Sequence, residues 1–309
     1  MPDPRSDTAR TDTAHPETVP ADSAPQIGNW GRWGAADELG AVNLITPEVV
    51  IAAAGLVKSG KVIPLGSPVG KNGAISAGRN PTWHVTVKVA QHDDPGRGRA
   101  EDMLTVHTHA HSHLDALSHV WYDGLAYNGH PSTVVGRGGA AKLRIDRIGG
   151  IVTRGVLLDL TAGGTRQWDI GEAIEPDDLV AALGRAGVEL RAGDALMLRT
   201  GWFDLMATGD ARFHAGEPGL SPAAVDWLLR ADPAVLAIDN FAFEIMPPPA
   251  GANPLQVHET VLRDHGVYLV ELLDLSALAA AGASEFLFVT APLLIEKGLG
   301  SPVNPLAIL

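Results

Sequence analysis

The stretch HTHAHSHLDALSHV, residues 107–120, contains five of the twelve histidines of this 309-residue chain. Four of them occupy every second position: His107, His109, His111 and His113. Imidazole is a common protein ligand of zinc, manganese and iron, and it titrates near neutral pH without further help. Such a concentration of imidazoles predicts a metal site at this point of the chain.

The alternation also predicts a strand at residues 103–109 that continues through the histidines. Side chains two residues apart share one face of a strand, so we expect the four imidazoles and Asp115 to line the same side. His119 follows four residues after Asp115 and is a candidate general acid or base. A divalent ion held by two or three such ligands keeps positions open for water and lowers the pKa of that water toward neutrality.

The composition restricts the other function classes. The chain has no cysteine, which excludes disulfides, thiolate metal sites, iron–sulfur clusters and a cysteine nucleophile. Any metal must therefore be held by nitrogen and oxygen. A formal net charge of −13 argues against nucleic acid and anionic membranes as partners. The expected partners are a small-molecule substrate and further copies of this chain.

The first 26 residues are rich in Pro, Asp, Thr, Ala and Ser without periodicity, which predicts a disordered tail. They lack the apolar core of a signal peptide, and no run of eighteen apolar residues follows, so a cytoplasmic location is expected. From residue 27 onward there is no low-complexity linker and no fixed-period repeat. Residues 27–309 are therefore predicted to form one domain.

Strand-like and helix-like segments alternate along this domain. Eight branched or alternating apolar runs predict strands at residues 61–65, 83–90, 103–109, 155–160, 195–200, 234–239, 266–273 and 285–294. Four helices are predicted at residues 47–60, 176–187, 221–232 and 254–266. Thr46 and Ser221 are the expected N-caps, each followed by a proline, and Gly266 closes the last helix. This order indicates an α/β or α+β domain.

Several segments resemble one known family. HAHSHLDALSH (109–119) is similar to the signature His-x-x-x-His-x-Asp-x-x-x-His of the cyclase or kynurenine formamidase-like metal-dependent hydrolases, whose longer members include isatin hydrolases. NWGRWGAADELGAVNLITPE (29–48) resembles their N-terminal segment, VHETVLRDHGVYLVELLDLSAL (257–278) their C-terminal metal segment, and EFLFVTAPLLI (285–295) their last core strand. The resemblance covers roughly residues 28–307.

The resemblance implies roles for individual residues. His109, His113 and Asp115 correspond to the ligands of a first metal ion, zinc or manganese, and His119 to the acid/base histidine. In the formamidases a second ion is held by the same aspartate with a histidine and a glutamate, which fall here on His258 and Glu271. Whether one or two ions bind stays open, as do the roles of His107 and His111.

The resemblance also implies a fold, an assembly and an activity. The fold is a swivelling β/β/α domain with a mixed, barrel-like sheet flanked by helices, and the assembly is a homo-oligomer, a dimer or a dimer of dimers. The implied activity is that of a metal-dependent amidohydrolase, arylformamidase-like or isatin hydrolase-like, which cleaves a carbonyl C–N or C–O bond in a ring-bearing amide, imide or lactam. Two alternatives remain: a cyclase or dehydratase step at the same site, and a metal-binding protein without catalysis.

The aromatic residues near the motif indicate where a ring could bind. Trp33, Trp83 and Trp121 lie near glycines or near the histidine stretch and are predicted to contribute to an apolar substrate pocket. Glu244, in the segment DNFAFEIMPPP, follows a predicted strand at a position where substrate loops are common in α/β domains.

Overall fold

The computed structural model describes residues 27–70, 79–91 and 96–309. Nine strands form one mixed sheet in the order β1-β15-β13-β7-β9-β11-β12-β4-β14. Its middle consists of four parallel strands: β7 (Ile151–Asp159), β9 (Ala195–Arg199), β11 (Val235–Ile238) and β12 (Tyr268–Glu271). Antiparallel strands extend it on both sides: β1 (Val62–Pro64), β15 (Leu306–Ile308), β13 (Glu285–Thr290), β4 (His113–Asp115) and β14 (Gly300–Pro302).

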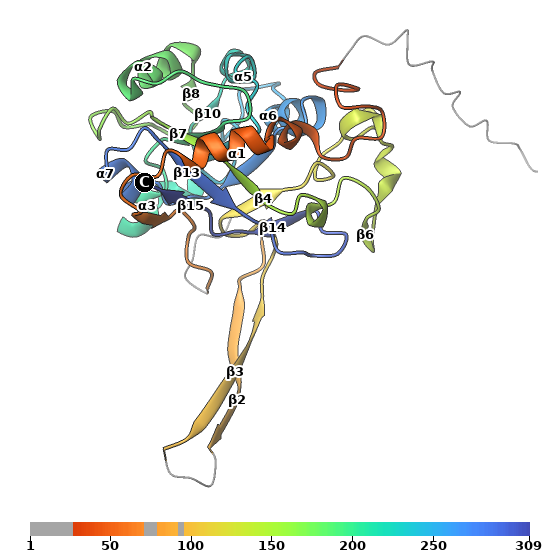
Figure 1. Cartoon of the computed structure of the whole chain (residues 1–309), viewed down its shortest axis with the longest axis vertical. Helices are drawn as coiled ribbons and strands as arrows, with labels where there is room; N and C mark the ends of the chain where they lie inside the picture. The colour runs from red at the N-terminus through yellow and green to blue at the C-terminus, as the bar shows by residue number, and fades with distance from the viewer. Residues whose placement is uncertain (1–26, 71–78, 92–95) are drawn as a thin grey trace, which may run out of the picture.

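The remaining elements are helices and short strands around this sheet (Figure 1). The α-helices are α1 (Pro47–Ala54), α2 (Pro176–Ala186), α3 (Asp204–Thr208), α4 (Arg212–Ala215), α5 (Pro222–Leu229), α6 (Gln256–His258) and α7 (Ser276–Ala280). A π-helical turn, Glu259–Asp264, continues α6, and 3₁₀ turns cover Gly40–Leu44, Tyr127–Gly129, Ser132–Val134 and Ile145–Arg147. Short strand pairs are β5 (Val135–Gly136) with β6 (Gly139–Ala140), and β8 (Ala173–Ile174) with β10 (Gly219–Leu220).

Local sequence signals determine where the helices begin. The Thr46 hydroxyl accepts a hydrogen bond from the Val49 N–H, and the Ser221 hydroxyl accepts one from Ala224, so both predicted N-caps are confirmed. The predicted α/β class, with a curled mixed sheet flanked by helices, is also confirmed. No helix in the described ranges is long and apolar enough to cross a bilayer. The disordered tail predicted for residues 1–26 lies outside the described residues, and the single domain remains a prediction.

The parallel strands form the core of the sheet. β9, β11 and β12 are buried over nearly their whole length, and they are rich in Leu, Val, Ala and Ile. Parallel strands need apolar residues on both faces because helices and loops cover both sides. Their carboxyl ends point to one edge of the sheet, where α/β proteins commonly place ligands.

One hairpin leaves the body of the molecule. β2 (Trp83–Gln91) pairs with β3 (Gly98–Thr105), and the two strands extend far from the sheet as a narrow ribbon (Figure 1). Every residue of β3 is exposed. The ribbon is therefore not part of the core that holds the sheet together.

The predicted strand through the histidines is wrong in its extent. β3 ends at Thr105, a turn closed by the Ala110 N–H and the His107 carbonyl (3.0 Å) follows, and β4 begins only at His113. The chain has to pass here from the exposed ribbon to the buried edge of the sheet, and it bends to do so. The alternate imidazoles consequently do not share one strand face.

Candidate metal centre

Three distant segments meet where β4 lies beside β12. The two strands are antiparallel, and their register places His113 opposite Glu271. His109 comes from the turn before β4, Asp115 is the last residue of β4, and His258 ends α6. We call these five residues the histidine–carboxylate cluster. Each of them is at most 5% exposed.

The polar atoms of the cluster converge. Asp115 Oδ1 lies 3.4 Å from His109 Nε2 and 3.5 Å from His113 Nε2, while its Oδ2 lies 3.4 Å from His258 Nε2. Glu271 lies 3.2 Å from His113 Nε2 and 3.3 Å from His258 Nε2. The predicted ligands are thus brought together, although not by the strand geometry that the sequence indicated.

Hydrogen bonds on the far side of two imidazoles determine which ring nitrogen faces the cluster. His113 Nδ1 donates to the His111 carbonyl oxygen at 2.7 Å, and His258 Nδ1 donates to both carboxylate oxygens of Glu244 at 2.9 Å. In each ring Nε2 is therefore directed to the carboxylates of the cluster. A carboxylate behind a ligating histidine is the usual way to fix its orientation and raise its basicity. Glu244, expected from the sequence in a substrate loop, lines the cavity and also orients the ring of His258 through these hydrogen bonds.

The donor atoms fit a divalent cation. Both oxygens of Asp115 and Oε1 of Glu271 are buried and accept no hydrogen bond from any described residue. Buried ionised carboxylates are costly without a compensating charge. Ligand atoms lie within 4.8 Å of one another in two sets that share Asp115: His109, Asp115 and His119, and His113, Asp115 and Glu271. A nitrogen and oxygen set of this kind accepts zinc and manganese.

The protonation states favour ligation at part of the cluster. Burial lowers the pKa of His109 to about 3, so its imidazole is neutral at physiological pH. Burial would raise the pKa of Asp115, but the surrounding histidines, His119 first, hold it below its usual value. Burial would lower the pKa of His258, yet Glu244 and Glu271 hold it well above the ordinary value. A cation at this position therefore has to displace a proton from His258.

His119 lies beside the histidine–carboxylate cluster and shares one of the two possible ligand sets with His109 and Asp115. Its ring stacks on His109 with centroids 4.3 Å apart, and lies 6.0 Å from the ring of His258. Burial lowers the pKa of His119, so the ring is neutral near pH 7 and able to accept a proton. It lines the cavity in front of the cluster.

This cavity has a volume of about 480 Å³. Its polar wall contains His113, His119, His258, Glu271, Glu244 and Glu217, and its apolar wall contains Phe213, Phe241, Met246, Pro247, Pro248 and Leu255. The segment DNFAFEIMPPP, expected from the sequence to be a substrate loop, contributes Phe241, Met246, Pro247 and Pro248 to the apolar wall. Phe213 and Leu255 were not expected there, because they come from segments without a sequence motif. The proline-rich segment after β11 was the one available signal.

The three tryptophans predicted for substrate binding are not among the described residues that line the cavity. Trp83 is 53% exposed on the ribbon, Trp121 is 44% exposed, and Trp33 packs against the core beside the Arg32 guanidinium. Their role in substrate binding stays a prediction. The sequence left the roles of His107 and His111 undecided. His111 Nε2 lies 2.6 Å from Thr82 Oγ1, and His107 Nδ1 lies 3.4 Å from Arg79 Nη1.

Comparison with known proteins gives consistent matches. The family model described as "Putative cyclase" matches residues 35–245, more than half of the chain, including the histidine stretch but not His258 or Glu271. An isatin hydrolase from Roseibium aggregatum is 28% identical over 237 residues, which cover 72% of this chain and 79% of that protein.

Two solved structures extend the likeness to the fold. The crystal structure of a protein described as a novel cyclase is 35% identical, with a TM-score of 0.83, and the match covers 92% of this chain and all of that one. An isatin hydrolase bound to the product analogue thioisatinate is 21% identical, with a TM-score of 0.61, over 85% of this chain and 99% of the other.

Proposed function

The chain belongs to the cyclase family, and we propose on this basis that it is a hydrolase that requires a divalent metal ion. The observation that carries the proposal is the pair of buried carboxylates, Asp115 and Glu271, whose unpaired oxygens meet three imidazoles behind a cavity. The likeness to an isatin hydrolase supports a small cyclic or aryl substrate with a carbonyl C–N bond, such as an amide, imide or lactam. The apolar wall of the cavity suits a ring.

The cluster residues would hold zinc or manganese, as one ion or two. We assign His109, His113 and Asp115 to the first site by family resemblance and by their mutual contacts, and His258 and Glu271 to a second that shares Asp115. When bound, such an ion polarises a carbonyl and makes water acidic enough to act near neutral pH. Glu244 keeps His258 in the ligating orientation.

The other cavity residues hold the substrate and move a proton. Phe213 and Phe241, whose rings are 4.5 Å apart, provide an apolar face for a ring. His119, neutral and adjacent to the ligands, accepts a proton from the attacking water and returns it to the leaving nitrogen or oxygen. This division of roles leaves the carboxylates free to hold the cation.

Metal content and turnover of a His113→Ala variant test the proposal together. We expect the wild-type protein, purified without added metal or chelator, to contain zinc or manganese and to hydrolyse members of a panel of aryl formamides and cyclic imides. His113→Ala should lose most of the metal and fall to the rate of the metal-free protein. His130→Ala is the matched control, since His130 lies outside the cluster and does not line the cavity. Full activity in the His113 variant would refute the assignment.

The cyclase or dehydratase alternative keeps the same site but does not consume water. The solved relative described as a cyclase favours testing it directly. Turnover in water labelled with oxygen-18 distinguishes the two, because hydrolysis puts one labelled oxygen into the product. Product without label would replace hydrolysis with cyclisation or elimination while leaving the metal site intact.

We also propose that the protein forms a homo-oligomer through its ribbon. Trp83, Val87, Val89 and Leu104 expose between 49% and 75% of their surface there, and a two-stranded hairpin is marginally stable alone. A second copy of the chain would cover this surface. Light scattering should give the mass of a dimer or larger assembly, and Val87→Glu should lower it, whereas a monomeric wild-type protein would contradict the proposal.

A further inference from the structure

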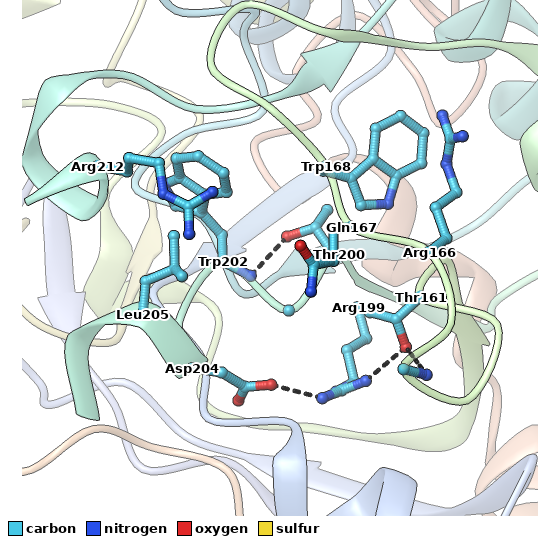
Figure 2. A pocket seen from close by; sticks show the side chains of 12 residues that line it. Thr161, Arg166, Gln167, Trp168, Arg199, Thr200, Trp202, Asp204, Leu205 and Arg212 are labelled. Atoms are coloured by element: carbon cyan, nitrogen blue, oxygen red, sulfur yellow. Dashed lines mark hydrogen bonds and ion pairs between the residues drawn. The ribbon is translucent and has the colours of Figure 1, made fainter. Parts of the chain in front are cut away.

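A second pocket lies at the carboxyl ends of the parallel strands β7 and β9, and no residue of the histidine–carboxylate cluster lines it. Figure 2 shows its lining side chains. Its volume is about 220 Å³. Its chemistry comes from six residues, which define the arginine pocket: Arg166, Trp168, Arg199, Trp202, Asp204 and Arg212. It shares no lining residue with the main cavity. Open α/β sheets characteristically bind ligands at this edge.

The floor of the arginine pocket is held rigidly. Asp239, directly after β11, accepts hydrogen bonds from the backbone N–H groups of Thr200 and Gly201, both at 2.8 Å. Gly201 has φ of +79°, and a Cβ there would lie 3.1 Å from Thr161 Cγ2. The chain therefore turns sharply at the end of β9, which places Arg199 and Trp202 on either side of the turn.

Two buried donors of this pocket have no acceptor. Arg199 donates from Nη2 to Asp204 at 2.6 Å and from Nη1 to Thr161 at 2.8 Å, as Figure 2 shows, but its Nε makes no hydrogen bond with any described residue. Trp202 is 2% exposed, and its indole Nε1 makes none either. By contrast, Trp168 Nε1 donates to the Leu160 carbonyl at 3.2 Å. Buried N–H groups without a partner are uncommon and costly.

The charges of the lining specify the kind of acceptor. Three guanidinium groups and one carboxylate, Asp204, line the pocket. Arg166 also pairs with Glu172 at 2.9 Å and Arg212 with Asp210 at 2.7 Å, both at the surface. Guanidinium groups and neutral N–H donors together suit an oxyanion, and the planar fork of arginine matches a carboxylate. Asp204 and the neighbouring Asp159, which both pair with Arg199, disfavour a doubly charged ligand such as phosphate. The volume is far larger than the roughly 15 Å³ that one water needs, so an organic anion fits.

We propose that the arginine pocket binds a small organic carboxylate carrying a single negative charge. Arg199 Nε and Trp202 Nε1 are covered in this structure, so the side chains around them shift when the carboxylate accepts their hydrogen bonds. Arg212, which is 44% exposed and pairs with Asp210, attracts the anion from solvent. The site is separate from the proposed metal centre, so binding is measured without reference to hydrolysis. Benzoate is a suitable probe because it carries one charge on a planar group.

Indole ¹H–¹⁵N spectra test the proposal directly. The chain has seven tryptophans, and Trp202→Phe identifies the Trp202 signal while keeping an aromatic ring in place. Titration with benzoate to about 10 mM detects a Kd near 1 mM. We expect a saturable downfield shift of the Trp202 indole proton. An unmoved Trp202 signal would mean that the donors bind only water, and the proposal would be wrong.

Two further arms locate the anion and define its class. Arg212→Gln should raise the benzoate Kd about tenfold, while Arg147→Gln, which removes an exposed charge from the 3₁₀ turn Ile145–Arg147, should leave it unchanged. Equal affinities in both variants would place the anion elsewhere. Inorganic phosphate should produce a weaker shift than benzoate, and the reverse order would overturn the assignment of a singly charged carboxylate.

Discussion

The histidine–carboxylate cluster and the arginine pocket lie at carboxyl ends of strands of the same sheet, but their unsatisfied atoms are opposite in kind. Among the described residues, both oxygens of Asp115 and Oε1 of Glu271 lack donors in the cluster, whereas Arg199 Nε and Trp202 Nε1 lack acceptors in the pocket. The first pattern suits a cation and the second an anion. The net charge of −13 does not predict that one site suits a cation and the other an anion. The sign of a ligand therefore follows from which buried atoms lack a partner.

Arg154 provides the reference for a buried arginine with a purely structural role. It is 5% exposed, and Asp194 accepts from its Nε at 2.9 Å and from its Nη2 at 2.7 Å. Glu285 accepts a hydrogen bond from Arg154 Nη1, and the Glu189 carbonyl oxygen accepts one from Nη2. All three guanidinium nitrogens are thus bonded within the protein, and none is left for a ligand. Arg199 differs from it in the single unpaired Nε.

The largest effect is predicted for the structural arginine. Asp194→Ala leaves the buried guanidinium of Arg154 without its main partner and should lower the free energy of unfolding by about 3–5 kcal/mol. Urea unfolding followed by circular dichroism measures the loss. Asp210→Ala, which removes the exposed partner of Arg212, is the control and should leave the midpoint nearly unchanged. Similar midpoints for the two variants would contradict the structural role assigned to the buried pair of Arg154 and Asp194.

The second prediction concerns the space that the cluster requires. Gly300 on β14 pairs with Asp115, and a Cβ at this position would overlap the ring of His109 at Nε2. Gly300→Ala should therefore displace this ligand and reduce turnover about a hundredfold, because small misplacements of reacting groups have effects of this size. Metal content should fall with it. Gly138→Ala is the control, since nothing lies within 4 Å of a Cβ at Gly138.

Gly300 also shows what the sequence could and could not predict. The helix caps and the approximate positions of the eight strands depend on neighbouring residues, and all of these elements are present. His109, His113, Asp115, His258 and Glu271 were identified from spacing and family resemblance, and the structure brings them together. Their geometry was mispredicted because alternation alone does not reveal the turn after His107. A glycine required by contact with a distant histidine leaves no local signal.

The cavity walls were not predictable for a related reason. Phe213 and Phe241 are separated by 28 positions and meet only because the segments after β9 and β11 fold over the same sheet edge. The sequence instead pointed to tryptophans near the motif or near glycines. None of these three, Trp33, Trp83 and Trp121, is among the described residues that line the main cavity. Proximity along the chain does not reveal the lining of this cavity, because the strand order of the sheet, not the sequence order, decides which loops become neighbours.

The third prediction tests the carboxylate behind His258. Glu244→Gln keeps the shape of the side chain but removes the charge that His258 Nδ1 contacts. Metal affinity should fall about 10- to 100-fold, the usual effect of losing such a partner. Competition with a chromogenic chelator measures the affinity. Glu259→Gln, one residue after His258, is the matched control, and an equal loss there would assign the effect to general negative charge.

The smallest effect is predicted for the apolar wall of the main cavity. This wall contains neither the unpaired oxygens of the cluster nor the unpaired nitrogens of the arginine pocket. Phe241→Leu removes one face of the aromatic pair with Phe213 and should raise KM about tenfold for a ring-bearing substrate, with kcat little changed. Metal content should stay at the wild-type value, because Phe241 supplies no ligand atom. Phe241 packs against the apolar cluster that contains Trp202 and Phe213, so the benzoate response is measured against the ligand-free signal of the variant itself. The benzoate Kd should be unchanged, because the two sites share no lining residue. A lower metal content would instead tie this wall to the cation site, and an altered benzoate Kd would tie it to the arginine pocket. Either result would end the separation between the two regions.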